Sequence, residues 1–245
     1  MMVAERRRLD QALVERGLAG SRERAQALIR AGLVTVAGSA ASRSDQLVAA
    51  EQPIALSGSG DYVSRGGEKL VAALDGFGID VSGRSCLDVG ASTGGFTDVL
   101  LRRGAARVVA VDVGYGQLAW KLRQDPRVIV LERQNIRHLA ALPASADLAT
   151  IDVSFISLRL VLPPVHRLLS PPGDVIALVK PQFEVGKGAV GKGGVVRDPA
   201  QHQRVLSELS RFVREPGYEV AGQIPSPVLG AKGNREFLLY LKPNG

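Results

Sequence analysis

Residues 86–96 read CLDVGASTGGF, and this stretch decides the fold of most of the 245-residue chain. An apolar strand ends at Val89, and a run of small residues then leads into a helix. Small residues let a ligand approach the backbone, and a helix N-terminus offers free N–H groups. Asp112 closes the next apolar strand, where a carboxylate can accept hydrogen bonds from both hydroxyls of an adenosine ribose. The stretch therefore predicts an α/β domain with a nucleoside-binding edge.

Strands and helices alternate outward from this stretch, from residue 65 to residue 245. Strands are expected at Ser85–Gly90, Arg107–Val113, Val128–Glu132, Leu148–Val153, Asp174–Val179, Tyr218–Ile224 and Glu236–Leu241. Helices are expected at Gly67–Phe77, Gly95–Arg103, Gln117–Arg123, Leu158–Leu169 and Pro199–Glu215. The loop before the last strand contains two prolines and no helical pattern. Because parallel neighbours need a crossover element, this loop favours an antiparallel final strand in a seven-stranded sheet.

A smaller α+β unit is expected ahead of this domain, at residues 1–57. One helix is closed by Gly17, and a second is capped by Ser21 and closed by Gly32. Two short strands are then expected at Leu33–Val36 and Pro53–Leu56. Serine and glycine alternate from residue 57 to residue 60, which is the composition of a flexible linker. The expected domains are therefore 1–57 and 65–245, with a linker at 58–64.

Composition excludes several classes of protein. The net charge of +7, from 31 basic and 24 acidic residues, is compatible with a phosphate-rich partner. A single cysteine, Cys86, allows no disulfide within the chain and no cysteine-based metal site, and the three histidines lack ligand spacing, so no metal is expected. No run is long and apolar enough to span a membrane, and no apolar segment follows the first basic residues. We expect a cytoplasmic protein with no membrane partner.

Arginines crowd the two helices of the small unit, and their planar forks suit phosphate. Acidic residues interleave, so a solvated surface of ion pairs is the alternative. The pattern RLDQALVERGLAGSRERAQALIRAGLVTVAG, at residues 8–38, resembles the RNA-binding domain first seen in the fourth small-subunit ribosomal protein. The resemblance implies RNA contacts from Arg6, Arg8, Arg22 and Arg24. Arg8-Leu9-Asp10 also resembles a motif of pseudouridine synthases, but it opens a helix of the small unit and does not recur.

The glycine turn distinguishes between two kinds of cofactor. A dinucleotide normally requires Gly-x-Gly-x-x-Gly, whereas here Gly90 is followed only by Gly94 and Gly95. Asp88-Val89-Gly90, then small residues and Gly-Gly-Phe, resembles the first motif of S-adenosylmethionine-dependent methyltransferases. The resemblance implies S-adenosylmethionine as cofactor, bound by Asp88, Gly90, Ala91, Ser92, Thr93, Gly94, Gly95, Phe96, Asp112 and Asp152, with Gln134 and Asn135 near the adenine.

Two lysines and two carboxylates are expected beside this cofactor. Asp152 and Lys180 lie at the carboxyl ends of strands, and an antiparallel final strand would begin with Glu236 at the same edge. Lys69 lies on the helix that leads into the domain. A ribose hydroxyl must lose its proton as a methyl group arrives, and a lysine can take it only when neutral, which burial or a second cation favours. Lys180 is the candidate base, Lys69 the second cation, and both carboxylates orient the lysines.

The ordered set Lys69, Asp152, Lys180 and Glu236 resembles the Lys-Asp-Lys-Glu tetrad of FtsJ-type ribose 2′-O-methyltransferases. The stretches VSRGGEKL, LDVGASTGGFTDVLL, DVGYGQLAWKLR, IDVSFISL and LVKPQFE extend the resemblance to the TlyA family of ribosomal RNA methyltransferases. That family implies a Rossmann-like methyltransferase sheet. It also implies 2′-O-methylation of cytidine in small-subunit or large-subunit ribosomal RNA, or both, with the RNA or an assembled subunit as partner. The sequence leaves the oligomeric state open.

Four further features are assigned, and three of them carry alternatives. Phe155 is expected either to stack on a target base or to pack in the core. Arg65, Arg133 and Arg137 are expected near the active edge as phosphate contacts or as ordinary surface residues. Trp120 is expected to pack inside the domain. Residues 184–198 have P-loop spacing, but Gly193 replaces the required hydroxyl residue, so a loop closing over RNA or a plain flexible loop is expected instead.

Two rival functions remain. The first is a non-catalytic RNA-binding protein, which would keep the basic small unit without needing the tetrad or the cofactor loop. The second is a membrane-lytic protein, because relatives of this family have been labelled hemolysins. The sequence has no spanning segment and no long amphipathic helix that would favour the second rival.

Overall fold

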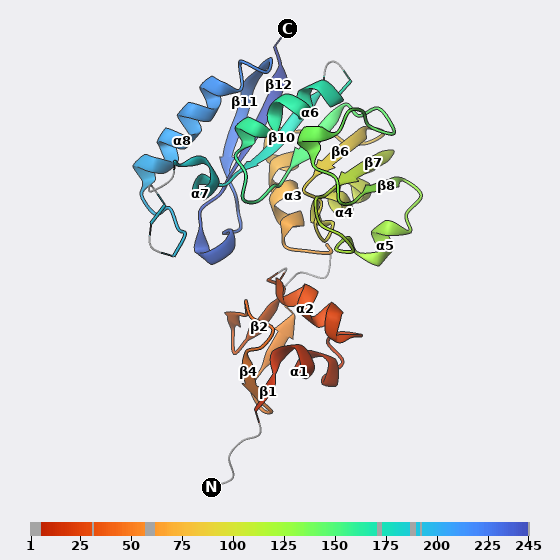
Figure 1. Ribbon diagram of the computed structural model, residues 1–245, viewed down its shortest axis with the longest axis vertical. Helices are drawn as coiled ribbons and strands as arrows, with labels where there is room; N and C mark the ends of the chain where they lie inside the picture. Colours follow the sequence, from red (N-terminus) through yellow and green to blue (C-terminus); the bar gives the residue numbers. More distant parts are fainter. Residues whose placement is uncertain are drawn as a thin grey trace. The chain divides into compact units, whose positions relative to one another are not determined.

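The computed structural model describes residues 6–30, 32–56, 62–170, 173–186, 190–191 and 193–244. These residues form two compact units, one within 1–65 and the other within 66–245 (Figure 1). Part of the expected linker, residues 58–61, lies outside the described residues.

The small unit is built from short elements. Its helices are α1 (Leu9–Glu15) and α2 (Arg22–Arg30), and its strands are β1 (Arg6–Arg8), β2 (Val34–Val36), β3 (Ser39–Ala40), β4 (Leu47–Ala49) and β5 (Ile54–Leu56). Strand β1 pairs with β4, while β3, β2 and β5 form a second small sheet. Both helices end where the sequence predicts, because Gly17 and Gly32 adopt the left-handed backbone that glycine tolerates. Strands β1, β3 and β4 were not expected.

The large unit contains the expected seven-stranded sheet. Its strands are β6 (Ser85–Val89), β7 (Arg107–Val111), β8 (Val128–Leu131), β9 (Leu148–Ile151), β10 (Asp174–Val179), β11 (Tyr218–Pro225) and β12 (Phe237–Pro243). Their order across the sheet is β11-β12-β10-β9-β6-β7-β8. Strands β10, β9, β6, β7 and β8 are parallel, whereas β12 runs antiparallel to both β10 and β11. The expected antiparallel final strand is confirmed.

Helices cover both faces of this sheet (Figure 1). They are α3 (Gly66–Phe77), α4 (Gly95–Arg102), α5 (Trp120–Arg123), α6 (Leu162–Leu168), α7 (Pro181–Glu184) and α8 (Pro199–Phe212). Leu87 and Val89 share a buried cluster with apolar residues of α6 and α8. Between them, Asp88 points to the opposite face and accepts a hydrogen bond from Thr97 of α4. The alternation along β6 therefore assigns α6 and α8 to one face and α4 to the other.

Three helix expectations need correction. The helix expected at Leu158–Leu169 is a 3-10 turn, Leu158–Leu160, followed by α6. Pro163 and Pro164 cause the break, because a proline has no N–H to donate to the preceding turn. The helix expected from Gln117 begins only at Trp120, and α7 was not expected. The packing expected for Trp120 is wrong, since this residue is 69% exposed.

Candidate active site

The loop after β6 makes a turn that only glycine can form. Gly90 has φ +84°, and a Cβ built on it would lie 2.6 Å from the carbonyl oxygen of Asp152. The backbone N–H of Asp152 in turn donates to the carbonyl oxygen of Val89 at 2.9 Å. The cofactor loop and the carboxyl end of β9 are therefore in direct backbone contact.

Asp88 lies beneath this loop and does not line the cavity beside it. Its carboxylate is fully buried and accepts hydrogen bonds from the hydroxyls of Thr97, at 2.6 Å, and Thr150, at 3.1 Å. Burial raises the pKa of Asp88 to about 6, and the two hydroxyl donors oppose that rise. Asp88 therefore links β6 to α4 and β9 from below the turn.

Other members of the loop shape its backbone. Ala91 and Gly90 donate to the carbonyl oxygen of Val111, and Gly94 donates to that of Ala91. The carbonyl oxygen of Thr93 accepts from the N–H of Ala119. Gly95 and Phe96 are buried at the start of α4. Within the expected set from Gly90 to Phe96, Gly90 and Ser92 are the residues that line the cavity.

Asp112 follows β7 and faces the glycine turn. Its carboxylate accepts from the backbone N–H groups of Ser92, at 2.8 Å, and Gly114, at 2.6 Å. Each carboxylate oxygen has two acceptor sites, so each keeps one for a ligand. Ser92 also donates its hydroxyl to Gln117 at 3.2 Å. Asp112 is therefore held in place by backbone groups while it remains able to accept hydrogen bonds from ribose hydroxyls.

A cavity of about 800 Å³ opens along these strand ends. The expected residues that line it are Gly90, Ser92, Asp112, Gln134, Asn135, Arg137, Asp152 and Phe155. The side chain of Asn135 accepts from the N–H and the guanidinium of Arg137, which fixes this part of the wall. The volume is in the range of small-molecule and cofactor sites.

The four expected catalytic residues form two ion pairs. Lys69 Nζ lies 2.5 Å from Glu236 Oε2, and Lys180 Nζ lies 2.6 Å from Asp152 Oδ1. Lys69, Lys180 and Glu236 are buried, whereas Asp152 is partly exposed and lines the cavity. Lys180 also donates to the hydroxyl of Ser154 at 3.0 Å. Gly230 makes room for Glu236, because a Cβ there would collide with its carboxylate.

Sheet topology brings the two pairs to one edge. Glu236 immediately precedes β12, Lys180 immediately follows β10, and Asp152 immediately follows β9. These strands are neighbours, with Val179 paired to Phe237 and Ala177 paired to Ile151. The antiparallel direction of β12 therefore places its first residues beside the last residues of β10 and β9.

Phe155 projects at the mouth of the cavity. It is 91% exposed, so the alternative of core packing does not hold. Its backbone has φ +64°, a conformation that is strained for a bulky residue. Its ring packs at a tilt against Phe183, with 5.1 Å between the ring centres. An exposed aromatic ring beside this cavity is a surface on which a nucleic-acid base can stack.

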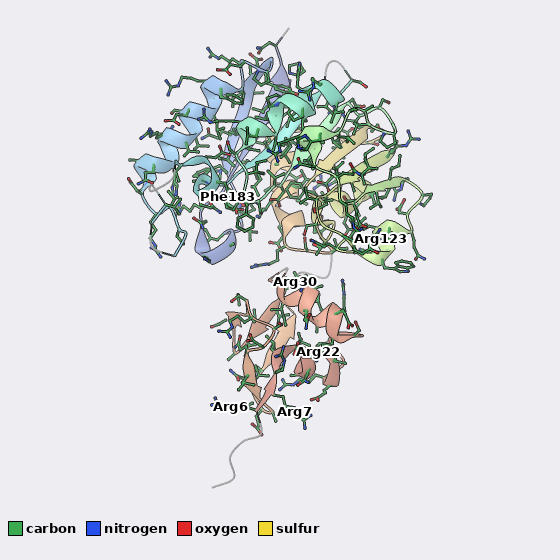
Figure 2. The ribbon with its side chains drawn as sticks, viewed as in Figure 1. Arg6, Arg7, Arg22, Arg30, Arg123 and Phe183 are labelled. Atoms are coloured by element: carbon green, nitrogen blue, oxygen red, sulfur yellow. The ribbon has the colours of Figure 1, made fainter. Side chains whose placement is uncertain are left out.

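The expected RNA contacts have different environments. Arg8 and Arg22 both bind the buried carboxylate of Asp10, and Arg6, Arg22 and Arg24 are all exposed (Figure 2 labels Arg6 and Arg22). Arg133 stacks on the ring of Tyr115, at 4.3 Å from its centre. Arg65 belongs to the small unit, where its guanidinium occupies the space beside Gly32. Arg133 and Arg137 belong to the large unit, and Arg137 lines the cavity.

Sequence reasoning missed Ser154, Gln117 and Phe183, which also line the cavity. Ser154 and Phe183 lie two and three residues beyond Asp152 and Lys180. Their closeness to strand ends was the available signal. No group of three or more metal-ligating side chains occurs among the residues that the structure describes, and no helix among them is long and apolar enough to cross a membrane.

Comparison with known proteins extends this description. Residues 62–243 match the model of the FtsJ-like methyltransferase family, and residues 7–54 match that of the S4 domain. A protein of Mycobacterium tuberculosis named 16S/23S rRNA (cytidine-2′-O)-methyltransferase TlyA is 51% identical over 98% of this chain and 91% of its own length. A Bacillus subtilis protein named "Putative rRNA methyltransferase YqxC" is 49% identical over 98% of this chain and 87% of its own.

A solved structure is similar over nearly the whole chain. Its title is "Putative hemolysin from Streptococcus thermophilus", and it is 42% identical, with a TM-score of 0.77 over 99% of this chain and 90% of that one. The match to the methyltransferase family agrees with the seven-stranded sheet, in which the last strands are antiparallel. The chain is a methyltransferase that belongs to the TlyA family of FtsJ-like enzymes with an N-terminal S4 domain.

Proposed function

We propose that this chain transfers a methyl group from S-adenosylmethionine to the ribose 2′-hydroxyl of a cytidine in ribosomal RNA, with Lys180 as general base. The relatives named as ribosomal RNA methyltransferases support the substrate class. The observation that carries the catalytic assignment is the pairing of two lysines with two carboxylates at one edge of the sheet. Three of these residues adjoin the ends of β12, β10 and β9, and Lys69 comes from α3.

The residues around the glycine turn fit this cofactor. A side chain at position 90 would collide with the backbone of Asp152. Glycine therefore lets the loop pack directly against the end of β9 at the cavity wall. Asp112 offers its carboxylate to ribose hydroxyls, while Gln134 and Asn135 present amides along the wall where an adenine would bind. When bound, S-adenosylmethionine supplies an electrophilic methyl group on a positively charged sulfur.

Lys180 is the group best placed to accept the proton of the ribose hydroxyl. Its amine lies at the carboxyl end of β10, with Asp152 and Ser154 as hydrogen-bonding or ion-pair partners. These two partners orient the amine, and a catalytic group that is already oriented lowers the entropic cost of reaching the reactive geometry. Transfer of the proton to a positioned base contributes typically about 10²–10⁴-fold to the rate of such reactions.

The second ion pair sets the charge beside this lysine. Glu236 precedes β12, the neighbour of β10, and it is neutralised by Lys69 from α3. The two opposite charges of this pair cancel each other at the edge that carries Lys180. We therefore assign Lys69 and Glu236 to the orientation and charge balance of the site, not to proton transfer itself.

The target nucleotide would reach the cavity unpaired. Phe155 offers its ring as a stacking surface for the base, and Arg137 and Arg133 offer guanidinium groups to nearby phosphates. The S4 domain supports an RNA partner, with Arg6, Arg8, Arg22 and Arg24 as its proposed phosphate contacts.

The test is transfer of labelled methyl from S-adenosylmethionine to ribosomal subunits and to naked ribosomal RNA that lack the modification. Wild type should label a ribose 2′-oxygen, and Lys180→Ala should lose at least about 10²-fold in rate. Lys242→Ala is the matched control, because Lys242 is an exposed lysine near the other end of β12. Transfer to no ribosomal substrate by a wild-type protein that binds the cofactor would overturn the proposal.

A further inference from the structure

Two segments of the large unit contact each other beside the cavity, residues 152–158 after β9 and residues 180–184 after β10. They are joined at three places. Lys180 holds Asp152 and Ser154 at the start of both segments. Further along, the ring of Phe183 packs on that of Phe155.

The third junction is made by Glu184, the last residue of α7. Its Oε2 accepts from the hydroxyl of Ser157 at 2.6 Å, and its Oε1 accepts from the backbone N–H of Leu158 at 2.8 Å. These two residues begin the 3-10 helix Leu158–Leu160, so the carboxylate caps that helix from a different part of the chain. Burial raises the pKa of Glu184, while its two hydrogen bonds oppose the rise.

The segment that Glu184 holds carries the strained Phe155. A bulky residue with φ +64° persists only where the surrounding structure fixes the chain on both sides. On the N-terminal side, the ion pair and the hydrogen bond of Lys180 fix Asp152 and Ser154. On the C-terminal side, the described contacts that fix Ser157 and Leu158 from outside the segment include both oxygens of Glu184.

We propose that Glu184 is a positioning residue, which keeps Phe155 projecting into the mouth of the cavity through its bonds to Ser157 and Leu158. Phe155 then receives the base of the target nucleotide at a fixed distance from Lys180, because α7 follows Lys180 directly in the chain. The inference rests on the proposed function for the role of Phe155. It assigns to Glu184 no contact with substrate or cofactor.

Hydrogen exchange tests the mechanical part without any substrate. In Glu184→Ala, the amides of residues 153–159 should exchange faster, on the order of tenfold, because the Leu158 N–H loses its acceptor. Glu184→Gln, which keeps one acceptor oxygen, should show a smaller change. The matched control is Glu208→Gln, since Glu208 of α8 binds Arg159 on the same 3-10 helix without touching Ser157 or Leu158. Equal exchange in Glu184→Ala and wild type would overturn the proposal.

A double-mutant cycle tests the functional part. Glu184→Ala should lower kcat/KM for ribosomal RNA by about tenfold and leave the Kd for S-adenosylmethionine unchanged. Phe155→Ala should lower kcat/KM by at least as much. If Glu184 acts through Phe155, the double variant should be no slower than Phe155→Ala alone. Losses that simply multiply would show that Glu184 does not act through Phe155, and would overturn the proposal.

The two proposals fail in different ways. A wild-type protein that methylates no ribosomal RNA contradicts the proposed function, and the exchange experiment still decides whether Glu184 holds the 153–159 segment. If wild type is active and the losses in kcat/KM of the two single variants multiply in the double variant, only the role of Glu184 is contradicted.

Discussion

The small unit and the large unit both hold cations on carboxylates, but they use different cationic side chains. In the small unit, Asp10 is fully buried and binds Arg8 through two hydrogen bonds and Arg22 through one. In the large unit, Asp152 and Glu236 bind Lys180 and Lys69. A guanidinium stays charged at every physiological pH, whereas a lysine can lose its proton in a protein interior.

This difference matches the proposed work of each unit. The hydrogen bonds of Arg8 and Arg22 hold the pKa of Asp10 below its usual range, so all three groups stay ionised. Two fixed guanidinium groups with further N–H donors suit permanent phosphate binding. A pair of lysines suits a site where one amine must accept a proton. The comparison therefore predicts that arginine cannot replace lysine in the large unit.

The substitution Lys180→Arg should give the largest effect. Arginine keeps the positive charge beside Asp152 but cannot act as a base, so the rate of methyl transfer should fall about 10²–10⁴-fold. Initial rates under saturating cofactor measure the loss, and a thermal shift with S-adenosylmethionine checks that the cofactor still binds. An active Lys180→Arg enzyme would break the comparison, because charge alone would then suffice.

The substitution Lys69→Met should mainly lower stability. It leaves the buried Glu236 without its partner, and breaking a buried pair in this way costs about 3–5 kcal/mol. Lys180→Met should cost less, since its partner Asp152 is more exposed and lines the cavity. Urea unfolding of both variants measures the free energies.

The double variant Lys69→Met/Glu236→Gln is the control, and it should recover much of the stability, because neither partner is then left charged and alone. Equal losses in Lys69→Met and Lys180→Met would contradict the expected difference between the two pairs.

Much of the large unit could be predicted from the sequence. Strands β6, β9 and β10 are apolar runs bounded by charged or small residues, and each is found within about two residues of its expected ends. The meeting of Lys180 and Asp152 follows from the rule that the carboxyl ends of parallel strands share one edge. Placing Glu236 at the same edge also required the last strand to be antiparallel, which the proline-containing loop before β12 indicated.

Other features leave no periodic signal in the sequence. Strands β1, β3 and β4 have three residues or fewer, too short for an alternating pattern to show. The contact of Glu184 with Ser157 joins residues far apart in the chain, and nothing local marks it. Trp120 was expected inside because large apolar residues are usually buried, yet it lies at the surface of α5.

Asp10 and Asp88 extend the comparison to pH. Both are fully buried, but Asp88 has only hydroxyl and backbone donors, and its pKa is raised to about 6. A carboxyl whose pKa is higher in the folded than in the unfolded state destabilises the fold as pH rises between the two values. The large unit should thus lose about 2 kcal/mol between pH 4 and pH 7 through Asp88.

The measurement is urea unfolding across this pH range for wild type and Asp88→Asn, whose amide can still bond both threonines. The variant should lack this fall. Asp10 has the opposite sign, because its pKa is lowered, so its contribution is present near neutral pH and disappears as pH falls below the usual carboxyl range. Parallel pH curves for wild type and Asp88→Asn would show that Asp88 does not titrate in this range.

The smallest effect is expected for a single arginine of the small unit. Arg22→Ala removes one proposed phosphate contact and leaves Arg8 on Asp10, so binding to a ribosomal RNA transcript should weaken only several-fold. The slope of log K against log salt should become shallower by about 0.7–0.9, the value for one phosphate contact. Arg43→Ala is the matched control, since Arg43 is an exposed arginine of the same unit that pairs with Asp45. An unchanged slope in Arg22→Ala would mean that Asp10 holds Arg22 for the fold alone, and the small unit would then bind RNA through other exposed arginines, such as Arg6 and Arg24.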